Sequence, residues 1–146
     1  MTAKEIFYEA MRRTDAGDQE GFLEMFADDC HWVVPGAEFG SKEELRGWLT
    51  PFWQGFSTFR HDIHRAVSDT EDEVFAEGTW TGTHDGVIPM PDGEVPPTGR
   101  TVSFRFAIAA RRAADGDLAQ DIRLYFDNLE FLGQLGVLPE GGTIAA

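Results

Sequence analysis

Apolar residues recur at helical spacing in three places near the start of the chain. The first set predicts an amphipathic helix that ends near residues 15–17, and Asp18 can cap a short second helix. Residues 41–44 have the sequence of a capping box and open a third helix, which Pro51 should end or kink. Residues 28–34 predict a short strand between the second and third helices. The apolar positions of the helices are Ala3, Ile6, Phe7, Ala10 and Met11; Phe22, Met25 and Phe26; and Leu45, Trp48, Leu49 and Phe52.

Strands dominate the second part of the chain. The pattern predicts long strands over residues 56–67, 74–84, 101–112 and 118–127, and then a short apolar helix. Four prolines between Gly86 and Gly99 exclude a central strand there and predict an ordered loop at a sheet edge or pocket mouth. Helices and strands in separate runs predict an α+β fold in which a curved antiparallel sheet wraps around the N-terminal helices and encloses a conical cavity. The length suits a single domain over residues 1–146.

The turn between the first two long strands determines which side chains share a face, because neighbours along a strand alternate faces. A turn centred between Thr70 and Glu71 places His61 opposite Trp80. We therefore expect one common face that contains Phe59, His61, Ile63, Arg65 and Val67 together with Val74, Ala76, Trp80 and His84.

The last hairpin allows two registers. A two-residue turn at residues 115–116 places Asp127 opposite Phe104, in apolar surroundings that raise the pKa of a carboxyl group. The register one residue away places Asp127 opposite Arg105, which lowers that pKa. The second register is slightly favoured because it separates the faces more cleanly. It puts Arg105, Arg123, Tyr125 and Asp127 on one face, and Phe104, Phe106, Ile108, Ile122, Leu124 and Phe126 on the other.

Composition limits the partners of the protein. With 12 Lys and Arg against 26 Asp and Glu, the formal net charge is −14, which argues against nucleic acid and against an anionic membrane surface. No apolar run is long enough to span a bilayer, and residues 1–5 lack the features of a signal peptide, so we expect a cytoplasmic protein. Cys30 is the only cysteine and the histidines lack metal-ligand spacing, so we expect neither a metal nor another cofactor. The 12 Phe and 4 Trp suit an aromatic-lined pocket.

Several short motifs resemble those of the SnoaL-like polyketide cyclase family, within the nuclear-transport-factor-2-like superfamily, and the resemblance covers essentially the whole chain. The motifs that carry it lie at residues 18–29, 72–74, 80–86, 97–100, 125–127 and 134–136. The resemblance implies a cone-shaped α+β barrel with a deep pocket, often dimeric through its sheet. It also implies that Asp127 is the general acid/base of a cofactor-free aldol closure. Residues 121–124 differ from the His and Trp that many relatives carry there. The superfamily also includes isomerases, dehydratases, epoxide hydrolases and binding domains, so the reaction stays open.

Three hypotheses follow for function. In the first, an acid/base enzyme acts on a hydrophobic carbonyl compound, Asp127 moves the proton, and His84 or Arg105 stabilises the oxyanion. In the second, the domain binds a ligand without turnover and Asp127 is a helix cap. In the third, Arg105 or Arg123 holds Asp127 ionised for epoxide hydrolysis. We expect a homodimer that binds a hydrophobic small molecule. The expected substrate-binding residues are Trp32, His61, Trp80, Phe106, Arg123 and Tyr125.

Overall fold

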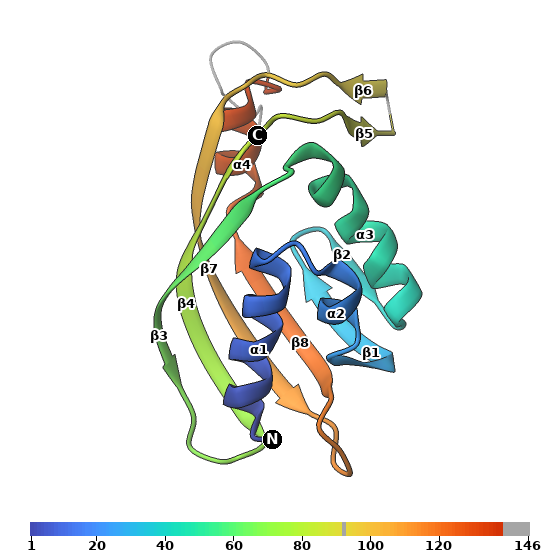
Figure 1. The fold of residues 1–146 in the computed structure, drawn as a ribbon, viewed down its shortest axis with the longest axis vertical. Helices are drawn as coiled ribbons and strands as arrows, with labels where there is room; N and C mark the ends of the chain where they lie inside the picture. Colours follow the sequence, from blue (N-terminus) through green and yellow to red (C-terminus); the bar gives the residue numbers. More distant parts are fainter. Residues whose placement is uncertain (92, 139–146) are drawn as a thin grey trace.

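The computed structural model describes residues 1–91 and 93–138. A curved sheet lies on one side of the molecule, and three helices pack against its concave face (Figure 1). The helices are α1 (Ala3–Asp15), α2 (Gln19–Leu23), α3 (Lys42–Gly55) and α4 (Asn128–Leu135). The strands are β1 (Phe26–Val34), β2 (Ala37–Phe39), β3 (Phe59–Val67), β4 (Glu73–Thr83), β5 (Ile88–Met90), β6 (Gly93–Val95), β7 (Thr101–Arg112) and β8 (Ala119–Phe126). The α+β class is confirmed.

Local capping explains where the helices begin. The side chains of Asp18 and Ser41 accept hydrogen bonds from backbone N–H groups at the starts of α2 and α3, as expected. Helix α3 does not end at Pro51 but continues through it to Gly55. Proline lacks an N–H group, so the carbonyl of Gly47 loses its usual donor within the helix. No helix of the described residues is long and apolar enough to cross a membrane.

The main sheet has the strand order β2-β1-β8-β7-β4-β3 and is not closed into a complete barrel. All neighbouring strands are antiparallel except β1 and β8, which run parallel. The expectation of a wholly antiparallel sheet was therefore wrong at this one pair. The described residues of the proline-rich segment contribute the small β5–β6 hairpin, which lies outside the main sheet. This agrees with the expectation that it would not form a central strand.

The register of β3 and β4 places His61 opposite Trp80, as predicted. The register shifts between Ile63 and Arg65, which marks a β-bulge. Because one extra residue reverses the alternation of faces, Arg65 and Val67 are exposed and do not share the face of His61. Their predicted orientation was wrong for this reason.

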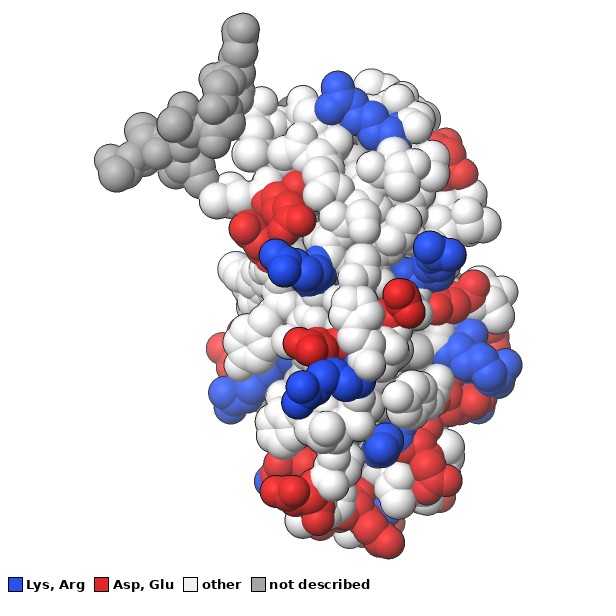
Figure 2. Space-filling view, turned by 90° about the vertical axis from the view of Figure 1, so that its left-hand side faces the viewer, with Lys and Arg blue, Asp and Glu red and all other residues white. Residues whose placement is uncertain are grey.

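The register of β7 and β8 pairs Phe106 with Phe126. Continued by one residue, it brings Arg105 level with Asp127, which is the favoured one of the two predicted registers. Residues of β7 alternate between exposed and buried from Thr101 to Ile108. Arg105 consequently lies on the outer face of the sheet, where Lys or Arg and Asp or Glu are interspersed among uncharged residues (Figure 2).

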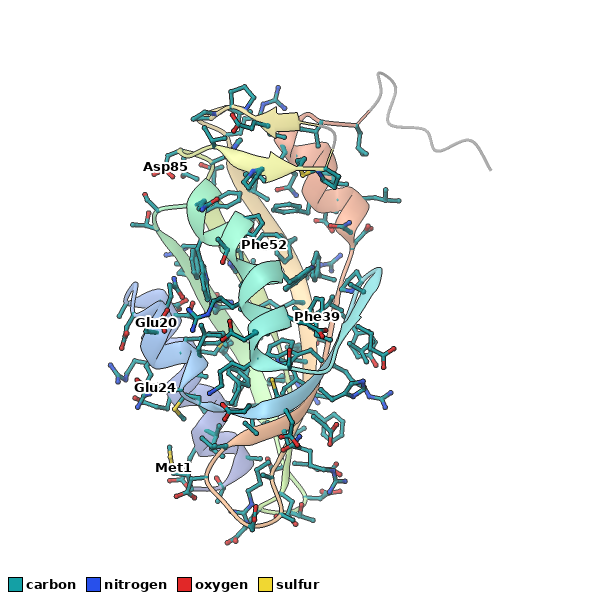
Figure 3. All side chains as sticks on the ribbon, turned by 90° about the vertical axis from the view of Figure 1, so that its right-hand side faces the viewer. Met1, Glu20, Glu24, Phe39, Phe52 and Asp85 are labelled. Carbon is teal, nitrogen blue, oxygen red and sulfur yellow. The ribbon has the colours of Figure 1, made fainter. Side chains whose placement is uncertain are left out.

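Aromatic side chains fill much of the space between α3 and the sheet (Figure 3). The indole of Trp80 stacks against Phe59 on the neighbouring strand, with ring centroids 5.7 Å apart, and against Phe104 at 5.1 Å. Phe131 of α4 packs edge-on against Phe104 at 5.6 Å. These contacts bury large areas and fix ring orientation, so the concave face of the sheet is a rigid aromatic wall.

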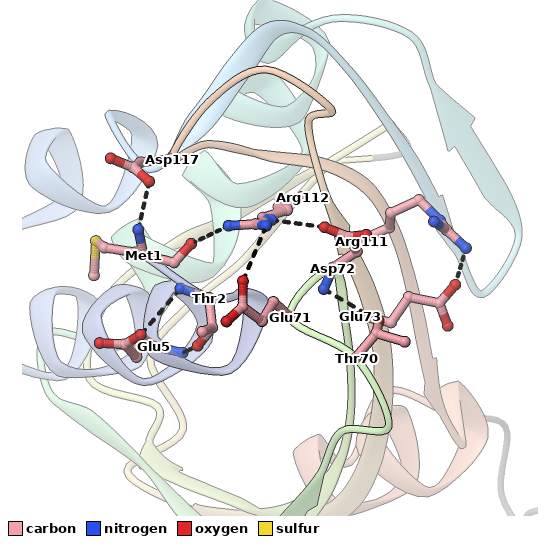
Figure 4. Close-up of polar contacts among 10 residues, drawn as sticks. All are labelled: Met1, Thr2, Glu5, Thr70, Glu71, Asp72, Glu73, Arg111, Arg112 and Asp117. Atoms are coloured by element: carbon pink, nitrogen blue, oxygen red, sulfur yellow. Dashed lines mark hydrogen bonds and ion pairs between the residues drawn. The ribbon is translucent and has the colours of Figure 1, made fainter.

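A polar cluster fixes the start of α1 at the other end of the sheet (Figure 4). The N-terminal amine donates to Asp117 at 2.5 Å, and this bond lowers the pKa of the Asp117 carboxyl. Arg112 donates to the Met1 carbonyl at 2.7 Å and to Asp72 at 2.9 Å. The N–H of Ala3 donates to the Glu71 carbonyl at 2.8 Å. Helix α1 is thereby held in line with the sheet.

Candidate active site

An apolar cavity lies between the three N-terminal helices and the concave face of the sheet. Its volume is about 110 Å³, below the roughly 300–1,000 Å³ of pockets that enclose drug-sized ligands, so it holds a small flat group or the head of a larger ligand. Most of its wall is aromatic or aliphatic. The lining residues are Met11, Thr14, Phe22, Trp32, Trp48, Leu49, Phe52, Trp53, Phe59, His61, Trp80, Phe104, Phe106, Ile108, Leu124 and Phe126.

His61 is the one residue among the described residues that line the cavity with an acid/base side chain. Its ring Nδ1 lies 2.6 Å from Oδ1 of Asp15, the last residue of α1. The backbone N–H of His61 donates to the other carboxylate oxygen at 2.9 Å. The His61 side chain is only 15% exposed. One carboxylate therefore fixes both the backbone and the ring of His61 at the cavity wall.

This pairing determines which ring nitrogen of His61 is available for chemistry. A carboxylate accepts hydrogen bonds, so Nδ1 of the ring carries the hydrogen and donates it to Asp15. In the neutral ring, Nε2 then has a free lone pair. No described residue forms a hydrogen bond with Nε2. The arrangement is that of a general base held in one tautomer by a carboxylate, which also stabilises the imidazolium formed when Nε2 takes up a proton.

Aromatic rings surround the imidazole. Phe59 and Phe106 meet it edge-to-face, with centroids 5.9 Å and 5.5 Å away. Thr14 also lines the cavity, and its hydroxyl donates to the side-chain oxygen of Gln19 at 2.8 Å. A ligand in this cavity would therefore meet one acid/base group in apolar surroundings, where electrostatic interactions are stronger than in water.

The profile of the SnoaL-like domain matches residues 5–120. The chain belongs to the SnoaL-like family. This confirms the resemblance noted in the sequence. A comparison with curated proteins gave no match.

Solved structures show the same fold at low sequence identity. AclR from Streptomyces galilaeus, provisionally named a hydroxylase, is 21% identical with a TM-score of 0.77; the match covers 94% of this chain and 82% of AclR. IdmH from Streptomyces antibioticus, provisionally named a polyketide cyclase, is 23% identical with a TM-score of 0.72, over 92% and 98%. A provisionally named SnoaL-like polyketide cyclase from Jannaschia sp. CCS1 is 18% identical with a TM-score of 0.74, over 92% of both chains.

Four of the predicted site residues of this SnoaL-like domain meet in the cavity. Trp32, His61, Trp80 and Phe106 all line it, as expected for substrate-binding residues. They come from β1, β3, β4 and β7, so the curved sheet brings together side chains that are far apart in the sequence.

Asp127 lies outside the cavity. It is exposed, and its side chain accepts hydrogen bonds from the N–H groups of Leu129 and Glu130, at 3.0 and 3.2 Å. It is thus the N-cap of α4, the structural alternative considered for it. Strand β8 ends at Phe126, one residue before Asp127, whereas the predicted strand continued through residue 127.

Arg105, Arg123 and Tyr125 also lie away from the cavity. All three are exposed on the outer face of the sheet. The alternation of faces along β7 and β8 explains this, because their neighbours Phe106, Leu124 and Phe126 occupy the cavity face. The expectation that the arginines and Tyr125 would act in the same pocket as Trp80 was wrong in this geometry.

His84 is fully buried but does not line the cavity. The backbone N–H of Thr98 donates to its Nδ1 at 3.2 Å, and the Thr98 hydroxyl lies 2.9 Å from the same atom. Its ring centroid is 5.6 Å from that of Phe56. His84 therefore links the end of β4 to the segment before β7, and the structure does not bring it to His61.

The sequence interpretation missed Asp15, which it took only as the end of a helix. Asp15 and His61 are 46 positions apart, and no local motif connects them. Only the packing of the C-terminal end of α1 against β3 brings them together. Within the part of the chain that the structure describes, no group of three or more His, Cys, Asp or Glu side chains could hold a metal ion.

Proposed function

We propose that this SnoaL-like domain is a cofactor-independent acid/base enzyme that acts on a hydrophobic, carbonyl-bearing small molecule, such as a polyketide-like or steroid-like compound. The observation that carries the proposal is the 2.6 Å contact between His61 and Asp15 in the wall of an otherwise apolar cavity. The provisional names of IdmH and the Jannaschia protein support it at the level of the fold family. His61 takes the catalytic role in this proposal, and Asp15 is its positioning residue.

The proposed chemistry is a proton transfer at carbon. Nε2 of His61 removes a proton from the carbon next to the ligand carbonyl, and the electron pair moves onto the carbonyl oxygen as an enolate. In isomerisation, the imidazolium returns the proton to another carbon. In cyclisation, the enolate carbon forms a bond to a second carbonyl, and the resulting alkoxide takes the proton. Both sequences restore neutral His61 and need no oxidant or reductant.

The aromatic wall supplies binding and orientation. Trp80, Phe59 and Phe104 form a stacked surface beside His61, and flat apolar ligands gain about 25 cal/mol for each Å² of apolar surface that they bury. Exclusion of water from this cavity also protects an enolate from premature protonation. The cavity thus favours a flat ligand with few polar groups.

Exchange of acidic C–H protons tests this proposal without knowledge of the natural substrate. A small bicyclic ketone, 2-tetralone, incubated in D2O with the protein should gain deuterium next to its carbonyl faster than in buffer. His61→Gln should slow the protein-catalysed exchange by about 10²–10⁴-fold, the usual contribution of a general base. His31→Gln is the matched control, because His31 pairs with Glu38 at 2.6 Å and does not line the cavity.

The same cavity suits a second candidate function, ligand binding without turnover, because its wall is almost wholly apolar. That function predicts tight binding of flat ketones and no acceleration of exchange. The comparison between the wild type and His61→Gln separates the two functions, since a pure binding module would leave the exchange rate at the buffer rate in both proteins.

We also propose a homodimer that forms through the outer face of the sheet. Phe75 and Tyr125 are 52% and 55% exposed there, beside a hollow whose lining includes Ala107, Ala109 and Arg123. Exposed aromatic side chains of this size are typical of association surfaces. Charges of both signs on this face (Figure 2) allow two identical surfaces to pair their opposite charges.

A further inference from the structure

A second apolar hollow, which we call the outer groove, adjoins the cavity. It lies among α3, the β5–β6 hairpin and α4; Figure 3 shows Phe52 on α3 with the hairpin above it and α4 beside it. Its lining includes Gly47 and Pro51 of α3, Ile88 and Pro89 of β5, and Leu132 and Leu135 of α4. None of these six residues lines the cavity.

Three aromatic residues line both the cavity and the outer groove: Trp48, Phe52 and Phe126. The ring of Phe52 lies 5.0 Å from that of Trp48 and 5.6 Å from that of Phe131, measured between centroids. Side chains rather than backbone therefore form the partition between the two hollows at this point. A side chain can change rotamer while the helix that carries it stays in place.

The walls of the outer groove are stiff. Pro35, Pro51, Pro89 and Pro91 all line it, and proline fixes the backbone φ angle. A groove with preformed walls loses little conformational entropy when an apolar group enters it. The four prolines therefore give the outer groove a preformed shape.

We propose that the outer groove holds the apolar tail of the same ligand whose carbonyl-bearing head lies against His61, and that Phe52 determines whether a tail can pass. The inference rests on the proposed function and extends it to a substrate class. The substrate has a flat head that fits the cavity and an apolar extension that leaves the cavity between α3 and α4. The groove's continuity with the cavity favours a tail of the ligand over a second protein chain.

A series of fluorescent ketones tests the proposal directly. The probes are 2-dimethylaminonaphthalenes that carry an acetyl, butyryl or hexanoyl group, so the head is constant and the apolar chain grows. Each methylene that enters the groove should lower the Kd of the wild type by about three- to fourfold. Phe52→Trp should abolish this dependence on chain length, because the larger ring narrows the passage. Phe52 also lines the cavity, so the three probes are compared with one another within this variant.

A pair of charge variants provides the matched control. Val137→Glu places a carboxylate in the groove, and Val87→Glu places one outside it, at positions that are 37% and 41% exposed. Val137→Glu should remove the gain in affinity from the longer chains, and Val87→Glu should retain it. Both residues are exposed, so neither substitution creates a cavity in the core.

Three outcomes would overturn the proposal. If all three probes bind the wild type equally well, the tail does not enter the groove, although the proposed function stands. If Val137→Glu changes the oligomeric mass but not the dependence on chain length, a second copy covers the groove. If the acetyl probe binds but the longer probes do not, while 2-tetralone exchange still depends on His61, the groove does not accept an apolar extension of the ligand. Loss of both probe binding and exchange would instead contradict the proposed function itself.

Discussion

Replacement of Asp15 by Asn should reverse the tautomer of His61 and remove its function as a base. In the wild type, the carboxylate accepts hydrogen bonds from the backbone N–H and from Nδ1 of His61, at 2.9 and 2.6 Å. An Asn oxygen can still accept from the backbone N–H, but its NH2 group then faces Nδ1. Nδ1 must become the acceptor, so the ring hydrogen moves to Nε2 and no lone pair remains there.

The size of the effect follows from this geometry. The catalysed proton exchange should fall by about 10²–10⁴-fold, because the base is present but in the wrong tautomer. The free energy of unfolding should fall by only about 1–2 kcal/mol, since one hydrogen bond to a charged acceptor weakens while the backbone contact is kept. Asp15 is partly exposed, so solvent screening places the loss toward the lower end of that range.

Long-range ¹H–¹⁵N NMR correlations can assign the tautomer of His61 in both proteins, and deuterium incorporation into 2-tetralone gives the rate. Urea unfolding of the same samples gives the stability. The reasoning would be refuted if Asp15→Asn kept the hydrogen of His61 on Nδ1, or if the variant catalysed exchange at the wild-type rate. A large loss of stability with the tautomer unchanged would assign Asp15 a purely structural role.

Three further predictions concern the rest of the molecule. Asp127→Ala should destabilise the protein by about 0.5–2 kcal/mol through loss of the α4 N-cap, whereas Asp127→Asn should be nearly neutral. Both variants should still catalyse deuterium exchange into 2-tetralone. Loss of that catalysis would assign Asp127 a catalytic role. Phe75→Glu combined with Tyr125→Glu should convert the dimer to a monomer in light scattering, and a wild type that is already monomeric would exclude the interface. Hydrogen bonds from Arg12 and Arg13 lower the pKa of Glu9 from 4.5 to about 2. A carboxyl group with a lowered pKa in the folded state stabilises the fold above its unfolded pKa, and this contribution is lost as the pH falls through the folded pKa. Glu9→Gln should therefore make the free energy of unfolding depend less on pH between pH 4.5 and 2. An unchanged pH dependence in this range would contradict the prediction.

The sequence was informative wherever local pattern determines structure. The turn before β4 was enough to place His61 opposite Trp80. The alternation of apolar residues along β7 was enough to separate the aromatic face of that strand from the face that carries Arg105. The same pattern correctly favoured the register that brings Arg105 level with Asp127. These features depend on neighbouring strands and short turns, which periodicity can specify.

Features that depend on packing between distant segments could not be read in this way. The parallel pairing of β1 with β8 joins segments from opposite ends of the chain. The bulge after Ile63 has no distinct sequence signal, although it decides the orientation of Arg65. The family resemblance assigned the acid/base role to Asp127. Whether Asp127 ends a strand or caps a helix depends on one residue of strand length, and pattern analysis places such a boundary only within a few residues.

The central claim is that His61 transfers a proton to and from a ligand inside the cavity. One pair of measurements, of ligand binding and of proton exchange, tests this claim. The Kd of the acetyl naphthalene probe and the rate of deuterium incorporation into 2-tetralone should be measured on the wild type and on His61→Gln. The account predicts similar probe affinity in both proteins and an exchange rate that falls by about 10²–10⁴-fold in the variant. Equal exchange rates in the two proteins, with the probe bound to both, would contradict it.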